Sequence, residues 1–145
     1  MRVLLNFKNR LIFTNPFLVF RKNRPLTTVT FIVDTGSPFT ILNYADAHKL
    51  RIPINQLKPA EGPVGLGGQT LDLRSFDEQV SFKLIANNKE NKEERIDLPI
   101  NKVLVGLPVK GQGNTPSLLG NDFLEENRLK LVFDPANNNA FAEKD

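Results

Sequence analysis

The sequence contains no cysteine and no tryptophan, and only one histidine and one methionine, among its 145 residues. Without cysteine the chain has neither a disulfide framework nor a thiolate nucleophile. The single histidine, His48, lies in a polar, helix-like segment, where we expect solvent exposure rather than catalysis. A Ser-His-Asp triad would have to use His48, and no nucleophile elbow accompanies it. One histidine, no cysteine and acids without recognisable ligand spacing predict no metal site, and we expect no other cofactor.

Long hydrophobic runs are missing as well. The apolar segments Leu11–Phe13 and Phe17–Phe20 are separated by Thr14-Asn15-Pro16, and no cleavage site of small residues follows them. No segment approaches the run of about 18 apolar residues that a membrane-spanning helix needs. We therefore expect a soluble protein of the cytoplasm, with no membrane partner.

Strong charge of either sign is also absent. The net charge is +3, and the basic residues are scattered among acids and asparagines. A domain that binds nucleic acid usually carries a tighter basic cluster. We expect no nucleic-acid partner, because the alternative of a basic β domain that binds nucleic acid would rest on net charge alone.

The length and the residue pattern favour one β domain. A chain of 145 residues, of which 40% are hydrophobic, is long enough to bury a core. Thr, Val, Ile and Phe fall in short stretches broken by Pro, Gly and Asn, which favours β structure over a helix bundle. We predict a single, mainly β domain over residues 1–145 with one or two short helices, and a loosely held tail over 136–145.

Local signals place several elements. Thr28–Val33 reads as a strand because it is rich in β-branched residues. Asn43 is predicted to cap a short helix that runs to Leu50. Asp122, with Glu125 three positions later, predicts a capping box at the start of a second helix. Further strands are expected at Val3–Phe7, Phe39–Leu42, Leu71–Phe76, Gln79–Ile85, Ile96–Val105 and Leu129–Phe133, with a solvated loop at Asn87–Arg95.

The segment Phe31-Ile32-Val33-Asp34-Thr35-Gly36-Ser37 places one carboxylate at the end of an apolar strand. Asp, Thr, Gly and Ser are all turn residues, so an ordinary Asx turn is one interpretation. A charge directly after three apolar residues is costly to bury unless it is hydrogen-bonded or useful. Asp34-Thr35-Gly36-Ser37 occurs once in the chain, so a pair of such carboxylates requires a second copy of the molecule.

Three motifs occur in the order that retropepsin-like aspartic proteases use, and the chain resembles this family over residues 28 to 134. They are Asp34-Thr35-Gly36-Ser37, the glycine-rich Gly65-Leu66-Gly67-Gly68, and Leu118-Leu119-Gly120. The resemblance implies a small closed β-barrel or sandwich with a flap hairpin. It also implies a homodimeric aspartic endopeptidase that cleaves an extended peptide or protein substrate.

The chemistry of such a site depends on two carboxylates. At about 3 Å apart they cannot both ionise, so the pair shares one proton. The ionised member acts as general base toward a water, and the protonated member polarises the scissile carbonyl. One Asp34 from each subunit would form this dyad on a two-fold axis, and it would favour acidic to near-neutral pH because one carboxyl must stay protonated.

The neighbours of Asp34 have roles of their own. The resemblance implies that Thr35 hydrogen-bonds across the two-fold axis. Gly36 permits a tight backbone path and leaves its N–H to face a carboxylate, and Ser37 can donate its hydroxyl to the outer oxygen of Asp34. The resemblance further implies that Leu118, Leu119 and Gly120 pack beneath the catalytic turn, although they also read as an ordinary core strand that ends before a helix.

Gly65, Leu66, Gly67 and Gly68 are interpreted as a flap that closes over an extended peptide and excludes water. Leu66 would touch the substrate, and backbone groups of Gly67 and Gly68 would bond to it by β-augmentation. A loop without this role remains the alternative. The segment lacks the Lys and Ser/Thr that follow a P-loop, so nucleotide binding is not expected.

Two positions depart from the viral members of the family. Asn121 stands where those members often have an arginine that pairs with an acid near the catalytic turn. Pro38 stands in that region in place of the acid, so a viral-style interface around the site is not expected. The alternative function is a catalytically silent dimerisation or peptide-binding module, because a fold does not fix an activity.

Overall fold

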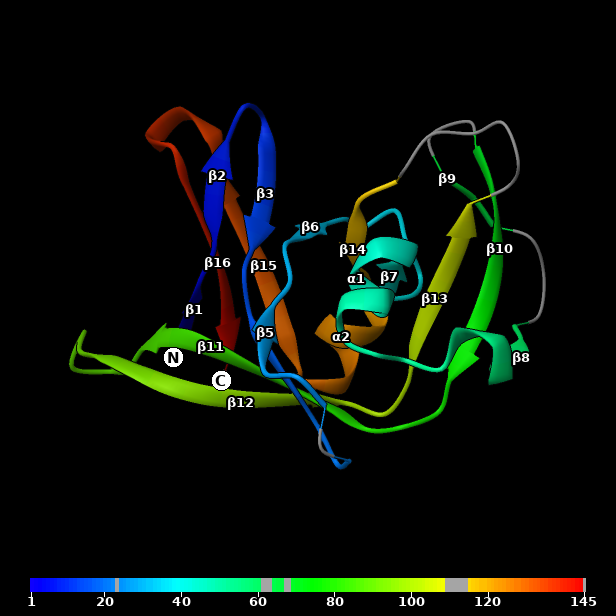
Figure 1. The fold of residues 1–145 in the computed structure, drawn as a ribbon. Coiled ribbons are helices and arrows are strands. Elements are labelled where there is room, and N and C mark those ends of the chain that lie inside the picture. Colours follow the sequence, from blue (N-terminus) through cyan, green and yellow to red (C-terminus); the bar gives the residue numbers. More distant parts are fainter. Residues whose placement is uncertain (23, 61–63, 67–68, 109–114, 145) are drawn as a thin grey trace.

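The computed structural model describes residues 1–22, 24–60, 64–66, 69–108 and 115–144, which fold into a mainly β structure with two short α-helices (Figure 1). The helices are α1 (Tyr44–Lys49) and α2 (Asn121–Glu126), with 3₁₀ turns at Ile54–Gln56 (η1) and Pro135–Asn137 (η2). The strands are β1 (Arg2–Leu4), β2 (Asn6–Lys8), β3 (Leu11–Thr14), β4 (Phe17–Phe20), β5 (Thr27–Thr28), β6 (Phe31–Val33), β7 (Ile41–Asn43), β8 (Lys58–Pro59), β9 (Val64–Leu66), β10 (Gln69–Phe76), β11 (Val80–Asn87), β12 (Glu93–Ile100), β13 (Val103–Pro108), β14 (Ser117–Leu119), β15 (Leu129–Asp134) and β16 (Asn139–Lys144).

The described strands form two sheets. The first has seven strands in the order β15-β16-β1-β11-β4-β5, with β12 also paired to β11. The second has nine strands in the order β2-β3-β6-β14-β7-β13-β10-β8, with β9 paired to β10. The predicted β class with one or two short helices is confirmed, and the pairings within the described ranges leave both sheets as open paths rather than a closed barrel.

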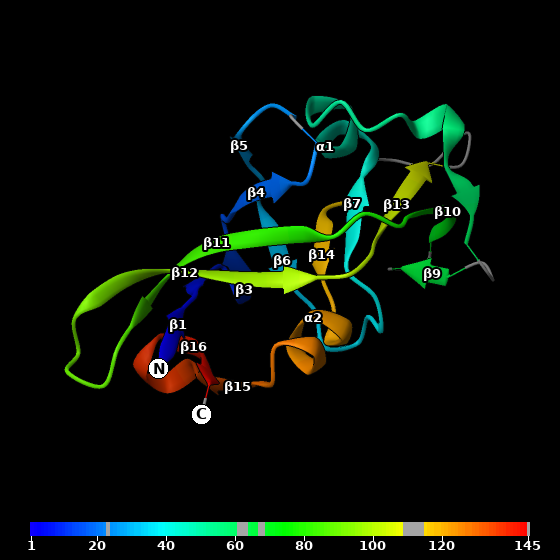
Figure 2. The ribbon, with the colours of Figure 1, turned by 90° about the horizontal axis from the view of Figure 1, so that it is seen from below.

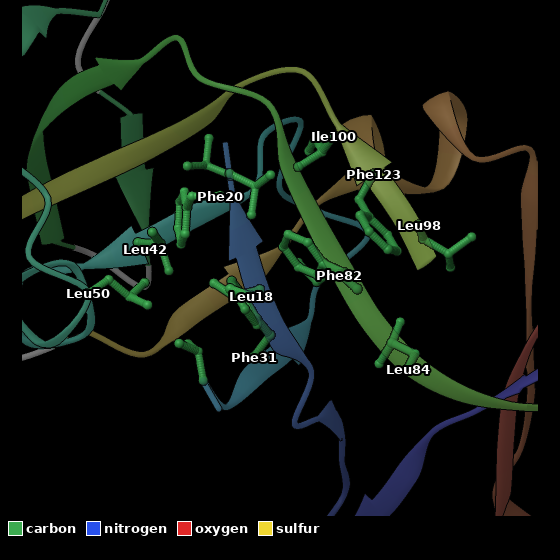
Figure 3. Close-up of a cluster of buried hydrophobic side chains, with 14 of the residues drawn as sticks. Leu18, Phe20, Phe31, Leu42, Leu50, Phe82, Leu84, Leu98, Ile100 and Phe123 are labelled. Carbon is green, nitrogen blue, oxygen red and sulfur yellow. The ribbon is translucent and has the colours of Figure 1, made fainter. Parts of the chain in front are cut away.

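The hydrophobic core lies where β11 crosses the molecule. Alternate residues of this strand, Val80, Phe82, Leu84 and Ala86, are buried, because successive side chains of a strand point to opposite faces. Figure 3 shows Phe82 between rings from β6 and α2, with centroids 5.2 Å from Phe31 and 4.8 Å from Phe123. Residues of both helices, Ala47 of α1 and Phe123 of α2, belong to this core together with Phe31 of β6, the strand that precedes Asp34.

Two hairpins stand side by side at the end of the molecule that holds the chain termini, β2–β3 and β15–β16, and the β9–β10 hairpin lies at the opposite end (Figures 1 and 2). Phe7 on β2 packs edge-to-face against Phe133 on β15, with ring centroids 4.9 Å apart. This contact joins the edge of one sheet to the edge of the other.

The tail predicted to be loosely held is instead a paired strand over most of its length. Strand β16 lies between β1 and β15 and pairs with both. Its residues Ala140 and Ala142 are 4% and 3% exposed. Small side chains at alternate positions let the strand lie close to the core. Because alanine is only weakly hydrophobic, the residue pattern there does not indicate a strand.

The predicted strand Ile96–Val105 is two strands in different sheets. Strand β12 ends at Ile100 and pairs with β11, whereas β13 begins at Val103 and pairs with β7 and β10. The chain changes sheets at Asn101 and Lys102. Strand β12 also begins earlier than expected, because its charged residues from Glu93 to Arg95 are exposed on a strand rather than in the loop.

No helix in the described ranges is long and apolar enough to cross a membrane.

Candidate active site

A parallel strand pair sets the position of Asp34. Strand β6 runs beside β14, with Phe31 opposite Ser117 and Val33 opposite Leu119. The pairing continues one step past the strand, since the Asp34 N–H donates to the Leu119 carbonyl oxygen at 3.0 Å. The aspartate is therefore held at the carboxyl end of a buried ladder.

The chain turns sharply after Asp34. The Ser37 N–H donates to the Asp34 carbonyl oxygen at 3.1 Å, and the Gly36 N–H donates to Asp34 Oδ1 at 2.9 Å. This is the geometry of an Asx turn, with the glycine N–H directed at the carboxylate. Asp34 is half-buried, and Thr35 and Gly36 are exposed. The structure thus shows a turn that presents a carboxylate at the surface.

Ser37 does not make the contact expected of it. Its side chain is 1% exposed, and its hydroxyl donates to the Phe39 carbonyl oxygen at 2.7 Å rather than to Asp34. The side chain points into the protein because the turn places Ser37 against the start of α2. Its role within one chain is to hold the shape of the turn.

The first turn of α2 is hydrogen-bonded to the backbone of Ser37 and Pro38. The N–H groups of Asn121 and Asp122 donate to the carbonyl oxygens of Ser37 and Pro38 at 2.9 and 3.2 Å. Helix N–H groups that have no partner inside the helix thus donate to the turn that follows Asp34.

Asp122 is not the helix cap that the sequence predicts. Gly120 occupies the N-cap position without a side-chain hydrogen bond, and Asp122 lies inside the helix. The Asp122 carboxylate accepts from the Thr40 N–H at 3.0 Å and from the Thr40 hydroxyl at 2.7 Å. The same hydroxyl accepts from the Gly120 N–H at 3.1 Å. Asp122 therefore bonds to Thr40, which is distant in the sequence, instead of forming the capping box that its local sequence predicts.

Gly120 has no room for a side chain. A Cβ atom at this residue would lie 2.3 Å from the Phe39 carbonyl oxygen and 2.9 Å from the Ser37 carbonyl oxygen. Leu118 and Leu119, which precede it on β14, are 6% and 2% exposed. The three residues lie directly under the turn, and glycine is required there by backbone-to-backbone contact.

Asn121 makes a contact with the turn that the sequence did not indicate. Its side-chain Nδ2 donates to the Thr35 carbonyl oxygen at 2.7 Å. The sequence drew attention to this position only as a missing arginine. The available signal was its place directly after the Leu-Leu-Gly motif, which the resemblance places beneath the Asp34 turn.

The glycine-rich segment forms part of a hairpin. Strand β9 pairs with β10, with Gly65 opposite Thr70 and Leu66 opposite Gln69. Gly67 and Gly68, for which a substrate contact is predicted, lie outside the described residues. Gly65 and Leu66 therefore lie on β9, the strand that pairs with β10, and the flap role stays a prediction.

Helix α1 contacts β7 and β13 and is capped as predicted. The Asn43 Oδ1 accepts from the Asp46 N–H at 2.8 Å. Asp46 in turn accepts from the Ser117 hydroxyl, which ties the helix to β14. His48 is exposed on α1 and stacks on Tyr44 with ring centroids 6.2 Å apart.

Other ligand chemistry finds limited support. Among the residues that the structure describes, no group of three or more His, Cys, Asp or Glu side chains is arranged to hold a metal ion. A hollow of about 420 Å³ lies on the first sheet, with apolar Leu4, Phe17 and Ile85 and charged Lys83 and Arg95 in its lining. It includes no residue of the Asp34 turn.

No protein-family model matches the chain, and no curated protein matches it. Solved structures do. A retropepsin-like aspartic protease from Rickettsia conorii aligns with a TM-score of 0.57 and 15% identity, over 98% of this chain and 88% of that chain. EIAV protease in complex with the inhibitor HBY-793 aligns with a TM-score of 0.44 and 20% identity, over 83% of this chain and 91% of that one.

The first of these alignments covers nearly the whole chain. The protein therefore has the retropepsin-like fold, the fold of a class of aspartic proteases, as the sequence motifs predicted.

Proposed function

We propose that the protein is an aspartic endopeptidase whose catalytic pair consists of one Asp34 from each of two identical subunits. The observation that carries this proposal is the geometry of the Asp34 turn. A carboxylate at the end of a buried parallel ladder accepts the Gly36 N–H at 2.9 Å, beside an exposed Thr35. The turn carries Asp34-Thr35-Gly36-Ser37 on a retropepsin-like fold, and this combination favours a catalytic role over an ordinary Asx turn.

The proposed reaction uses a water and no covalent intermediate. One Asp34 carboxylate takes a proton from the water as the water oxygen attacks the scissile carbonyl carbon. The other Asp34, protonated, donates a hydrogen bond to the carbonyl oxygen. The tetrahedral intermediate then collapses as the C–N bond breaks, and the leaving nitrogen takes up the proton that the first Asp34 removed from the water, which restores that carboxylate. Peptide hydrolysis is balanced by one water.

The second subunit follows from the count of aspartates in this motif. One chain contributes one such carboxylate, and a two-fold axis beside the turn would bring two together. The exposed Thr35 and Gly36 are available to the partner subunit. We also propose that the β9–β10 hairpin closes over the substrate through Gly65, Leu66, Gly67 and Gly68. The substrate is an extended peptide segment with apolar side chains near the scissile bond, in a cytoplasmic setting.

The rival is a dimerisation or peptide-binding module that keeps the fold without the activity. It is separated by incubating the wild-type protein and an Asp34→Asn variant with denatured proteins and a peptide library from about pH 4 to 7, with mass spectrometry as the readout. Asp134→Asn is a matched control, because Asp134 also ends a strand and its side chain accepts from a backbone N–H, that of Asn137.

We expect cleavage by the wild type and by Asp134→Asn, and none by Asp34→Asn. If the wild type and Asp34→Asn are equally inactive at micromolar concentrations, the protease proposal fails. Sedimentation of the wild type as a monomer at all concentrations, in the presence of substrate, would exclude the shared pair.

A further inference from the structure

We infer that Asn121 is a positioning residue for Asp34 and that it acts through the peptide group between Thr35 and Gly36. This inference rests on the proposed function, because it assigns a role in the same site. Asn121 touches neither the carboxylate nor, in the proposed reaction, the substrate. Its effect is on the direction of one backbone N–H.

Both polar atoms of the Thr35–Gly36 peptide are engaged, on opposite sides. The Thr35 oxygen accepts from Asn121 Nδ2 at 2.7 Å, and the Gly36 nitrogen donates to Asp34 Oδ1 at 2.9 Å. The peptide is planar and trans, so its C=O and N–H point in opposite directions. A hydrogen bond that holds the oxygen therefore also fixes where the N–H points.

Asn121 is itself held firmly enough to act as a support. Its backbone N–H donates to the Ser37 carbonyl oxygen at 2.9 Å, and its side chain donates to the Thr35 carbonyl oxygen. Asn121 is therefore hydrogen-bonded to the residues on both sides of Gly36. It follows Gly120, which packs so closely on the backbone of Phe39 that a Cβ there would lie 2.3 Å from the Phe39 carbonyl oxygen. The short amide side chain has few rotamers to lose when it is fixed.

These two hydrogen bonds matter because Thr35 and Gly36 could otherwise change their backbone conformation. Thr35 and Gly36 are exposed, and glycine accepts both signs of φ at little cost. Rotation of the peptide plane would turn the Gly36 N–H away from Asp34 and leave a carbonyl oxygen facing the carboxylate. A hydrogen bond to the carbonyl also polarises the peptide and strengthens its N–H as a donor.

The bond from Gly36 engages Oδ1 of Asp34 at 2.9 Å. The same bond fixes which oxygen of Asp34 faces the reaction. The neutral amide of Asn121 thus orients the Thr35–Gly36 peptide, in a region where Pro38 and Asn121 form no charged pair. A substitution that removes the Asn121 side-chain donor should therefore change the turn while the protein stays folded.

The test uses Asn121→Ala and Asn121→Asp, with Asn121→Gln as the conservative variant that keeps an amide. Asn127→Ala is the matched control, since Asn127 follows the same helix and its Nδ2 donates to the Pro99 carbonyl oxygen at 2.8 Å, away from the turn. The readouts are the Gly36 amide signal and its hydrogen exchange by NMR, and kcat and KM measured separately.

We expect Asn121→Ala and Asn121→Asp to lower kcat about five- to tenfold with little change in KM. The Gly36 amide should exchange faster. Asn121→Gln should recover part of the rate. Asn127→Ala should lower thermal stability and leave the Gly36 amide and kcat unchanged.

An unaltered Gly36 amide in Asn121→Ala overturns the inference, even in an enzyme that cleaves peptides. An unaltered kcat in Asn121→Ala overturns it as well. Absence of cleavage by the wild type overturns the proposed function instead, and the NMR comparison distinguishes the two failures because it needs no activity.

Discussion

The N–H of Asp34 donates to the carbonyl oxygen of Leu119 at 3.0 Å, although the two residues lie in distant parts of the sequence. The position of the aspartate is therefore set by β14, and through Gly120 by the start of α2. Changes under the turn and changes within the turn should have different consequences, and the first two predictions use that difference.

Gly120→Ala should destabilise the whole fold. The new Cβ would lie 2.3 Å from the Phe39 carbonyl oxygen, and a backbone atom cannot move aside as a side chain can. We expect a loss of at least about 3 kcal/mol in the free energy of unfolding, measured by urea denaturation. A loss below about 1 kcal/mol would show that β14 and the turn separate easily.

Gly36→Ala should leave stability nearly unchanged and reduce cleavage. The added Cβ would lie 3.1 Å from Asp34 Oδ1, the atom that accepts the Gly36 N–H, on an exposed part of the turn. We expect a change in unfolding free energy within about 1 kcal/mol and a clear fall in kcat. A loss of stability equal to that of Gly120→Ala would contradict the separation of support from site.

Asp122 and Thr40 should be energetically coupled. The carboxylate accepts from both the N–H and the hydroxyl of Thr40, at 3.0 and 2.7 Å. In a double-mutant cycle of Asp122→Ala and Thr40→Val we expect a coupling free energy of about 1 to 2 kcal/mol from denaturant unfolding. Additive losses would mean that the contact contributes nothing specific.

The control for that cycle is the pair Lys83 and Asp97. Their charged atoms lie 3.5 Å apart with side chains 46% and 61% exposed. Because exposed ion pairs are screened by solvent, their coupling should be much weaker than that of Asp122 with Thr40.

Ala142→Arg should be far more damaging than Asn139→Arg. Ala142 is 3% exposed on β16 and faces the core, whereas Asn139 is exposed on the same strand. Burial of an unpaired charge should cost more than about 3 kcal/mol of unfolding free energy, measured by thermal or denaturant unfolding. Equal and small effects would indicate that the strand is dispensable.

Mixed subunits test the shared catalytic pair. When an equal amount of Asp34→Asn is exchanged into a fixed amount of wild type, random pairing leaves about half of the original wild-type dimers. Activity should fall to about half, and further with excess variant. The control, exchange with Asp134→Asn, should cause no fall. Activity that is indifferent to Asp34→Asn would contradict a site made of two chains.

Several features were predictable from local sequence. The alternation along β11, the cap formed by Asn43 and the Asp34 turn after an apolar strand all depend on residues within a few positions of one another. The motif order also predicted the retropepsin-like fold. Periodicity and turn chemistry act over short distances, so they can be read without a structure.

Other features escaped the sequence because distant partners decided them. The local signal for a capping box at Asp122 was outweighed by Thr40, and the hydroxyl of Ser37 turned toward Phe39 instead of Asp34. The run Ile96–Val105 gave no sign that the chain changes sheets within it. Residues 139–144 have a weak strand pattern, and they form β16 because they pair with β1 on one side and β15 on the other.

The sequence by itself determined that one carboxylate per chain stands at the end of a buried strand, followed by residues that turn. Strand period and turn preference suffice for that. Only the tertiary structure decided what holds the turn, namely Leu119, Gly120 and the side chain of Asn121 on Thr35. The physical reason is that a hydrogen bond between distant segments exists only after the core has brought β6, β14 and α2 together.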